Sequence, residues 1–393
     1  MRSFEQSPLD PDFVQDPYSV YTRLRAQAGV QFWEDYGMAA VFDAASIQSL
    51  LRDRRLGRAI PDDRRQPVPA HLRDFYAVDH FSLLDMEPPA HTRLRGLVLR
   101  AFTSRRIRAL TGEIEEIADS LIDAFPEGPF DLIPAYCTEV PVRIIARLLG
   151  VPETSAPDLL RWSNAMVAMY QARRSREVED AANAAAREFT AFLRDYIAIR
   201  RKDPRDDLIT ELIAAEQDGE RLSSDELTGT VILLLNAGHE ATVHTLGNGV
   251  KALLGHGADP AWFTDGAIEG TVEEILRYDP PLHIFTRHVY EDLVIGGHPV
   301  SKGAQVALVL GAAGRDPAAV PEPDRFEPLR AQPVHAAFGG GLHFCVGAPL
   351  ARLEMRVALQ RLFARHPALR LTEAPRYGDT YHFHGLSRLM VAT

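Results

Sequence analysis

Cys345 is one of two cysteines in the chain, and it stands in a glycine-rich segment that runs from Phe338 to Gly347. Because glycine has no Cβ atom, such a segment lets the backbone come close to a flat, bulky group. A thiolate held there is a soft, electron-rich ligand for a transition metal. Pro349 and the apolar spacing of residues 350–363 predict a helix directly after the cysteine, whose free N–H groups would favour the charged thiolate. The segment therefore predicts a metal ligand at Cys345.

Two simpler interpretations compete with this one. A buried cysteine is most often a small hydrophobic residue, and a glycine run is most often a loop. The order of residue types is more specific, because an aromatic residue, glycines and a histidine precede the cysteine and another glycine follows it. The segment resembles the cysteine-ligand loop of the cytochrome P450 family, F-G-x-G-x-H-x-C-x-G. Every fixed position is met, by Phe338, Gly339, Gly341, His343, Cys345 and Gly347.

The resemblance implies a cofactor and a reaction. The cofactor is haem b, with the Cys345 thiolate as the axial ligand of the iron, and thiolate ligation favours cleavage of the O–O bond. The implied enzyme is a monooxygenase that uses O2 and two external electrons to hydroxylate or epoxidise a medium-sized, largely apolar small molecule. Two alternatives stay open: a peroxide-dependent haem-thiolate enzyme, and a non-catalytic haem-binding or sensor protein.

A second motif interrupts an apolar run in the longest predicted helix, Ser224–Gly255. Gly238 weakens a helix by about 1 kcal/mol relative to alanine, which indicates a close neighbour or a kink. Packing of helices through small residues would explain the motif equally well by itself. The segment is similar to the family's oxygen-binding groove, A-G-x-[DE]-T, and Ala237, Gly238 and Glu240 match it.

The alcohol position of this groove departs from the family pattern. Ala241 stands where the family usually has threonine, and Thr242 follows one residue later. One residue on a helix is a rotation of about 100°, so Thr242 cannot simply replace the missing hydroxyl. We therefore expect an ordered water, a substrate hydroxyl or a reoriented Thr242 to complete a proton relay that begins at Glu240.

Cationic residues occur where the haem carboxylates would need them. His91 and Arg95 lie four residues apart after a proline pair, on one face of a predicted helix. Taken alone they would be surface residues. They match the family's H-x-x-x-R pair, and the resemblance implies that Arg287 and His343 complete a set of four donors to the haem propionates.

Glu274 and Arg277 are separated by three residues on another predicted helix. Such a pair is usually a surface ion pair of little energetic value. The family's E-x-x-R motif instead implies a buried network with an arginine from the proline-rich coil, here Arg325. The implied role of this network is to anchor the cysteine loop.

Helical periodicity dominates the chain. Predicted helices cover Pro17–Ala26, Ala44–Arg52, His91–Phe102, Ile107–Phe125, Val140–Leu149, Ser155–Tyr170, Arg176–Arg201, Leu208–Glu216, Ser224–Gly255 and Gly266–Tyr278. Predicted strands cover Val30–Trp33, Met38–Phe42, Phe285–Tyr290, Leu293–Ile295 and Gln305–Leu310, and residues 56–81 form a long loop. These patterns predict a mainly α protein with a small β portion. The resemblance implies the cytochrome P450 fold, as a single haem domain over residues 1–393 with a long central helix over the haem.

The substrate pocket is placed by the family resemblance alone. It would draw on Leu56–Phe81, Met166, Met169, Tyr170, Leu234, His283–Phe285 and Tyr381–Phe383. Methionine and aromatic side chains there indicate an adaptable, apolar pocket. Terpenoid, fatty-acid, aromatic and macrolide substrates all fit this composition. His239 and His244 are expected to be packed or solvated, and Cys137 to lie in the core.

The chain has no Gly-x-Gly-x-x-Gly unit for NAD or flavin and no cysteine cluster for an iron–sulfur centre. We therefore expect an external ferredoxin or flavodoxin with its NAD(P)H reductase. Either a solvated basic face or a docking patch for such a partner would explain the arginines Arg100, Arg105, Arg106, Arg108, Arg352, Arg356 and Arg361.

Composition narrows the remaining possibilities. A hydrophobic content of 46% and a charged content of 25% are ordinary for a globular protein. The net charge of −11 argues against binding to nucleic acid or to an anionic membrane surface. Two cysteines and a polar N-terminal segment favour the reducing cytoplasm. We expect a cytoplasmic monomer.

Overall fold

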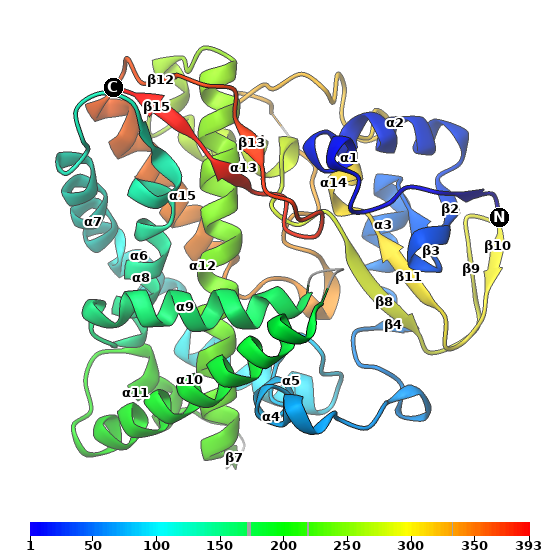
Figure 1. The fold of residues 1–393 in the computed structure, drawn as a ribbon, viewed down its shortest axis with the longest axis horizontal. Helices are drawn as coiled ribbons and strands as arrows, with labels where there is room; N and C mark the ends of the chain where they lie inside the picture. Colours follow the sequence, from blue (N-terminus) through cyan, green and yellow to red (C-terminus); the bar gives the residue numbers. More distant parts are fainter. Residues whose placement is uncertain (171–173, 218–219, 332) are drawn as a thin grey trace.

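The computed structural model describes residues 1–170, 174–217, 220–331 and 333–393. Helices fill most of the molecule, and a sheet near the N-terminus occupies one side (Figure 1). The first helices are α1 (Pro11–Gln15), α2 (Pro17–Gln27), α3 (Ala44–Leu50), α4 (Arg73–Asp79), α5 (Ala90–Ala101), α6 (Ser104–Ala109), α7 (Thr111–Asp123) and α8 (Glu139–Leu149). The later helices are α9 (Ala156–Val167), α10 (Arg176–Lys202), α11 (Leu208–Ala214), α12 (Ser224–Gly255), α13 (Ile268–Tyr278), α14 (Leu310–Ala313) and α15 (Ala348–Arg365).

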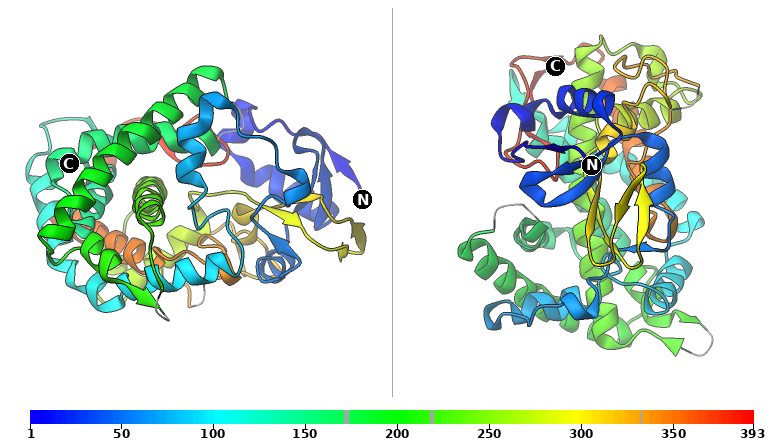
Figure 2. Two further views of the ribbon diagram at one scale, coloured as in Figure 1. Left: turned by 90° about the horizontal axis from the view of Figure 1, so that it is seen from below. Right: turned by 90° about the vertical axis from the view of Figure 1, so that its right-hand side faces the viewer.

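Helix α12 is the central element, and its bounds are those expected from the sequence. Its start is fixed by a capping box, in which the Ser223 hydroxyl accepts from the Glu226 N–H at 3.1 Å and the Glu226 carboxylate accepts from the Ser223 N–H at 2.8 Å. At about 1.5 Å per residue the helix is about 48 Å long. Figure 2 (left) shows it end-on, with other elements around it. Among the described residues, none of the helices combines the length and apolarity needed to cross a lipid bilayer.

Strands are short and come from both ends of the chain. The main sheet has six strands in the order β1 (Ser3–Phe4), β2 (Val30–Trp33), β3 (Met38–Val41), β11 (Gln305–Leu308), β8 (Phe285–Val289) and β4 (Leu56–Gly57). Four smaller sheets pair β15 (Met390–Ala392) with both β5 (Phe130–Asp131) and β12 (Arg370–Leu371), β6 (Glu216–Gln217) with β7 (Glu220–Arg221), β9 (Leu293–Ile295) with β10 (His298–Val300), and β13 (Arg376–Tyr377) with β14 (Leu386–Arg388). In the main sheet, β3 pairs in parallel with β11, with Ala40 opposite Ala307.

The prediction of a mainly α protein with a small β portion is confirmed, but several local predictions are wrong. The helix predicted over Ile107–Phe125 is two helices, α6 and α7, which meet at Leu110. The loop predicted over residues 56–81 contains α4, where Phe75 and Val78 are buried one turn apart. The helix predicted to reach Glu216 ends at Ala214, because Glu216 is already the first residue of β6. The strands β12 to β15 were not predicted, because strands of two or three residues are too short to show an alternation with a period of two.

Glu274 and Arg277 on α13 form the most deeply buried ion pair among the described residues, with both side chains fully inaccessible to solvent. The guanidinium donates to both carboxylate oxygens, at 2.6 and 2.7 Å, which is a bidentate geometry. It also donates to the carbonyls of Gly314, Pro323 and Arg325, at 2.7–3.0 Å. Arg277 therefore holds three points of the coil that leads to the cysteine loop.

The prediction that the Arg325 side chain completes this network is wrong. Arg325 contributes its carbonyl, while its guanidinium lies 3.4 Å from Glu322 at the surface, where both side chains are more than 60% exposed. The third charged side chain is Arg330, whose Nε atom lies 3.4 Å from Glu274. The spacing within the helix indicated the pair, but the partner from the coil depends on how that coil folds.

Glu354 on α15 is buried and unpaired. Only 2% of it is exposed, and neither carboxylate oxygen has a hydrogen-bond partner. Burial raises the pKa of Glu354 well above its usual value. The fold therefore favours the protonated form of this side chain.

Replacing Arg277 with alanine should destabilise the protein by about 3–5 kcal/mol, because Glu274 is left as an uncompensated buried charge. Urea unfolding measures this loss. Arg325→Ala is the matched control, and because its ion pair is exposed we expect a change of about 1 kcal/mol or less. Equal losses in the two variants would contradict the assignment of the anchor to Arg277.

Replacing Glu354 with glutamine should change how stability depends on pH. In the unfolded chain a glutamate ionises above about pH 4.3, whereas burial raises the pKa of Glu354 in the fold, so its proton is lost only at higher pH. The unfolded state therefore binds fewer protons, and the stability of the wild type falls as pH rises from about 4.3 towards the raised pKa. Urea midpoints between pH 5 and 8 should fall less steeply for Glu354→Gln. The control Glu269→Gln, at an exposed position, should keep the wild-type slope.

Candidate active site

The Cys345 loop is closed by its own backbone. The Cys345 N–H donates to the Phe338 carbonyl at 3.0 Å. Gly339 and Gly341 have φ angles of +68° and +65°, in the left-handed region that favours glycine. A Cβ atom on Gly341 would collide with the carbonyl of Leu51, so this glycine is also needed for close packing. The loop geometry explains why glycine is required at both positions.

The Cys345 sulfur lies just ahead of α15, as the sequence predicts. Gly347 caps this helix, and a Cβ atom on Gly347 would lie 3.8 Å from the sulfur. Cys345 is exposed, yet desolvation by the protein around its sulfur raises the pKa of the thiol. The N–H groups of Gly347 and Ala348, together with Arg95 and Arg352, act in the opposite direction. The N–H groups at the start of α15 therefore lower the pKa of the Cys345 thiol, as expected, but desolvation raises it by more.

Two of the expected propionate partners, His91 and His343, lie together beside this loop. Their ring centroids are 4.5 Å apart. Burial, together with the nearby His343 and Arg95, lowers the pKa of His91 to about 4. The Nδ1 atom of His91 is buried without a hydrogen-bond partner. Arg95 donates to the Phe344 carbonyl at 2.7 Å, one residue before the cysteine.

The fourth expected partner, Arg287, lies on β8. It is 2% exposed, and its guanidinium donates to the Thr286 carbonyl at 3.0 Å. Burial and the nearby Arg58 lower the pKa of Arg287 to about 10. Both arginines lie over the ring of Phe285, at 5.6 and 5.7 Å from its centroid. The fold therefore brings Arg287 close to a second cation.

Arg58 and Glu87 also belong to the surroundings of His343, although neither was predicted from the sequence. The Glu87 carboxylate accepts from the Arg58 N–H at 2.6 Å and lies 3.1 Å from His343 Nε2. Although burial opposes it, these contacts lower the pKa of Glu87. Glu87 precedes the proline pair that opens α5, but no helical spacing connects it to Arg58 or His343. Only the folded structure shows that Glu87 lies next to Arg58 and His343.

One face of α12 is accessible midway along the helix. Ala237 is exposed and Ala241, one turn later, is half-buried, although most of the helix is buried. Gly238 has the close neighbour that the sequence predicts, because a Cβ atom there would lie 3.3 Å from Ile145 of α8. The helix is continuous through this region, so the alternative of a helix break is not needed.

Thr242 points away from that accessible face. It is 5% exposed, and its hydroxyl donates to the Gly238 carbonyl at 3.2 Å. Glu240 is half-buried, its Oε2 atom has no hydrogen-bond partner, and its Oε1 atom lies 3.8 Å from His244 Nε2. A reoriented Thr242 would have to give up its bond within the helix. His244 is therefore a neighbour of Glu240 that the sequence interpretation had treated as packed or solvated.

The expected pocket residues divide into two groups. Leu234, Phe285, His382 and Phe383 are half-buried, and Met166 and Met169 are buried. His283 and Tyr381 are at most 3% exposed and are both hydrogen-bonded to Tyr21 of α2. The prediction that these last two line the pocket is wrong, because they belong to the N-terminal side of the core.

The remaining sequence expectations concern a cysteine, a histidine and the arginines. Cys137 is buried, as predicted, and of the two alternatives left open for His239, packed or solvated, the structure shows the packed one. Helix α6 packs against α15, which brings the arginine groups together. Three of the arginines are neutralised in ion pairs: Arg106 with Asp206 and Glu211, Arg352 with Glu273, and Arg361 with Asp119.

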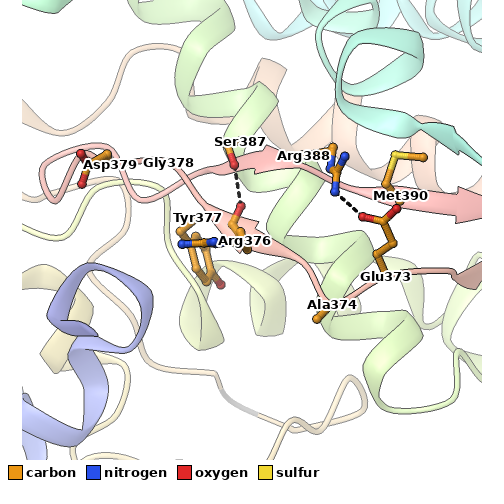
Figure 3. A pocket seen from close by; sticks show the side chains of 9 residues that line it. All are labelled: Glu373, Ala374, Arg376, Tyr377, Gly378, Asp379, Ser387, Arg388 and Met390. Atoms are coloured by element: carbon orange, nitrogen blue, oxygen red, sulfur yellow. Dashed lines mark hydrogen bonds and ion pairs between the residues drawn. The ribbon is translucent and has the colours of Figure 1, made fainter. Parts of the chain in front are cut away.

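A surface hollow of about 480 Å³ lies at β13 and β14, away from these motifs (Figure 3). Its lining includes Glu373, Arg376, Tyr377, Asp379 and Arg388, and none of the residues predicted for the site belongs to it. This hollow is therefore not the candidate active site.

The residues around Cys345 fit a haem. A thiol on an exposed cysteine can ligate iron, and His91, Arg95 and His343 lie beside it as donors for carboxylates. Arg287 lies near Glu87, which contacts His343. Three details agree with such a ligand: the unpartnered Nδ1 atom of His91, the buried guanidinium of Arg287, and the exposed Ala237 on the central helix. The donor set matches the cofactor that the sequence motif implies.

Comparison with known proteins gives one consistent result. The family profile described as "Cytochrome P450" matches residues 268–368. Vitamin D(3) 25-hydroxylase of Pseudonocardia autotrophica is 38% identical, over 96% of this chain and 94% of the relative. 6-Deoxyerythronolide B hydroxylase of Saccharopolyspora erythraea is 36% identical, over 91% of each chain. The crystal structure of P450BioI with an acyl carrier protein ligated to hexadec-9Z-enoic acid superposes with a TM-score of 0.91 at 31% identity, covering 98% of this chain and all of the other.

Proposed function

This chain belongs to the cytochrome P450 family and is a monooxygenase, and from that premise we propose that Cys345 holds a haem b at which one oxygen atom is inserted into a medium-sized, largely apolar molecule. The observation that carries the proposal is the convergence of Cys345 with His91, Arg95 and His343. When bound, a thiolate-ligated haem supplies the cleavage of the O–O bond. The protein supplies the binding, the orientation and the protons.

Binding of the cofactor is assigned to two groups of residues. Cys345 is the proposed axial ligand, in the turn formed by Phe338, Gly339 and Gly347. His91, Arg95, Arg287 and His343 are the proposed partners of the propionates. We add Arg58 as a further cation near that position, because it neighbours both Arg287 and Glu87. Glu87 orients the ring of His343.

Proton delivery is assigned to Glu240. Its unpartnered Oε2 atom can take up or release a proton beside the accessible stripe of α12, which includes Ala237, Gly238 and Ala241. Ala241 carries no hydroxyl, and the hydroxyl of Thr242 is already bonded inside the helix. An ordered water or a substrate hydroxyl therefore fits the next step of the relay better than Thr242 does.

The substrate class follows from the relatives and from the candidate pocket. The names of the relatives specify vitamin D(3), 6-deoxyerythronolide B and hexadec-9Z-enoic acid ligated to an acyl carrier protein. Leu234, Phe285 and Phe383 offer apolar surface of the kind such ligands need. A screen by spin-state shift should therefore start with secosteroids, macrolactones and long-chain acyl groups.

Electrons are proposed to come from an external ferredoxin or flavodoxin with its NAD(P)H reductase. Arg100, Arg105 and Arg108 are exposed on α5 and α6, and no ion pair involves them in the part of the chain that the structure describes. They remain available for an acidic partner, whereas Arg106, Arg352 and Arg361 are neutralised. The single-domain organisation over residues 1–393, the monomeric state and the cytoplasmic location stay predictions.

Replacing Cys345 with alanine should abolish the strongly red-shifted Soret band of the dithionite-reduced protein under carbon monoxide, because that band reports thiolate on the iron. Cys137→Ala is the matched control and should keep the band, since Cys137 is buried in the core. A band retained in Cys345→Ala would contradict the assignment. A band of the histidine type in the wild type would also overturn the proposed chemistry.

Replacing Glu240 with glutamine should lower turnover by about 10²-fold and divert electrons to peroxide, because the proton-holding carboxylate is lost. Thr242→Ala should leave both quantities nearly unchanged, and Ala241→Thr should reduce the peroxide loss by restoring a hydroxyl on the accessible face. Product and peroxide are measured with a substrate found by its spin-state shift and a surrogate ferredoxin and reductase. A larger defect in Thr242→Ala than in Glu240→Gln would assign the relay to Thr242 instead.

A further inference from the structure

A second polar cluster lies outside the haem motifs, where the two ends of the chain meet. Asp279 follows the last residue of α13, His283 lies four residues later, and His384 precedes β14. At most 2% of each residue is exposed. One ligand atom from each, an oxygen and two nitrogens, lie within 4.8 Å of one another. Such a set of two imidazoles and a carboxylate is a known donor set for divalent transition metals.

His283 directs a free lone pair into this cluster. Its Nδ1 atom is 2.8 Å from the Tyr21 hydroxyl, which itself donates to Tyr381 at 2.7 Å. With Tyr21 as the donor to Tyr381, the Tyr21 oxygen accepts from Nδ1–H of His283, and in this tautomer Nε2 carries the lone pair. The nearest hydroxyl to Nε2 is that of Tyr18 at 3.4 Å, but Tyr18 donates its proton to Asp279 at 2.9 Å. This is the arrangement of a metal-binding histidine, with its second nitrogen held by another side chain.

His384 supplies the second unsatisfied imidazole. Both of its ring nitrogens are buried without a hydrogen-bond partner, which is unusual for a residue that is 1% exposed. Its Nε2 atom lies 3.4 Å from Oδ1 of Asp279. The ring is stacked on Tyr377 at a centroid distance of 3.7 Å, so its position is fixed.

Asp279 presents one oxygen to the two imidazoles and uses the other for support. Oδ2 accepts from the hydroxyl of Tyr377 and lies 3.5 Å from Lys251 Nζ. Oδ1 is the atom that faces His384 and the hydroxyl of Tyr18. Ligating carboxylates in proteins are commonly held by such outer hydrogen bonds.

We propose that Asp279, His283 and His384 form a binding site for a divalent transition metal of the zinc class. Nε2 of His384 lies 3.4 Å from Oδ1 of Asp279, and the ligand atoms of the three residues all lie within 4.8 Å of one another. Donor atoms around zinc are about 3.3–3.6 Å apart for bonds of about 2.0–2.2 Å, so binding requires the three side chains to move slightly closer together. Two nitrogen donors favour zinc, nickel or copper over magnesium or calcium, which prefer oxygen. The site is independent of the proposed haem chemistry.

The surface hollow described above gives this site a way in. Tyr377 belongs to the lining of that hollow (Figure 3). Its ring is stacked on that of His384. A small displacement of the Tyr377 side chain would therefore expose the imidazole. An ion bound behind it would connect the end of α13 to the C-terminal β13–β14 hairpin and, through Tyr18, to α2.

Two cations oppose the proposed ion. Lys251 lies beside Asp279, and Arg315 lies over the ring of Tyr18 at 4.3 Å while it is paired with Asp324. Lys251 is the more accessible, with about a third of its side chain exposed. Removing the charge of Lys251 should therefore increase the affinity for the metal ion. If the cluster serves only as a hydrogen-bond network, this substitution should not increase metal affinity.

The test is a zinc titration of the full-length, haem-loaded protein without an affinity tag, after dialysis against a chelator. Calorimetry gives the Kd, and elemental analysis after gel filtration gives the zinc content. We expect one zinc ion per chain, a Kd weakened about tenfold or more in His384→Gln and Asp279→Asn, and a Kd tightened about threefold or more in Lys251→Met. His298→Gln, a change of a histidine on β10, should match the wild type.

Two outcomes would overturn the proposal. The first is no zinc uptake by the wild type at micromolar concentrations. The second is the same uptake in the wild type and in His384→Gln. If the variants that lose a ligand do not fold, the predicted gain in Lys251→Met decides the question. The Soret band of each sample reports the haem separately, so a failure of the metal site is distinguishable from a failure of the proposed function.

Discussion

The buried guanidinium of Arg277 is the constraint on which the rest of the structure depends. A fully buried positive charge is tolerated only where its N–H groups are bonded, and here two carboxylate oxygens and three carbonyls meet that need. The carbonyls belong to a coil that has almost no regular structure of its own. Because the guanidinium fixes that coil at three points, it also fixes the start of the cysteine loop.

The surroundings of Cys345 also contain buried charges, but here cations outnumber the acidic side chains that could pair with them. Several cations are gathered there, and Glu87 partly compensates them by contacting His343 and the backbone of Arg58. The burial of Arg287 lowers its pKa, which means that its charge is maintained at some cost. A dianionic cofactor would reduce that cost. The site is therefore electrostatically prepared for a ligand with two carboxylates, and this preparation is visible in the protein alone.

The sequence predicted those parts of the molecule in which neighbouring residues carry the information. The bounds of α12, the cysteine loop and the pairs His91–Arg95 and Glu274–Arg277 all depend on short, regular spacing. Contacts between distant segments were not predictable in this way, which is why Arg330 was missed and Arg325 was chosen. The same holds for Arg58, Glu87 and His384, whose partners lie elsewhere in the chain. The orientation of Thr242 required the helix geometry and the competing carbonyl of Gly238.

The parallel pairing of β3 with β11 has a consequence for synthesis. Val41 leaves the ribosome early, whereas its sheet neighbour does not exist until residue 308 has been translated. At roughly 5–20 residues per second, β3 waits on the order of tens of seconds with one edge unpaired. Its sequence, Met-Ala-Ala-Val, is apolar and is buried completely in the finished protein. An unpaired apolar edge can join the edge of another chain. Until β11 has been made, this edge of β3 is open to pairing with another chain, and a high concentration of nascent chains would favour such pairing.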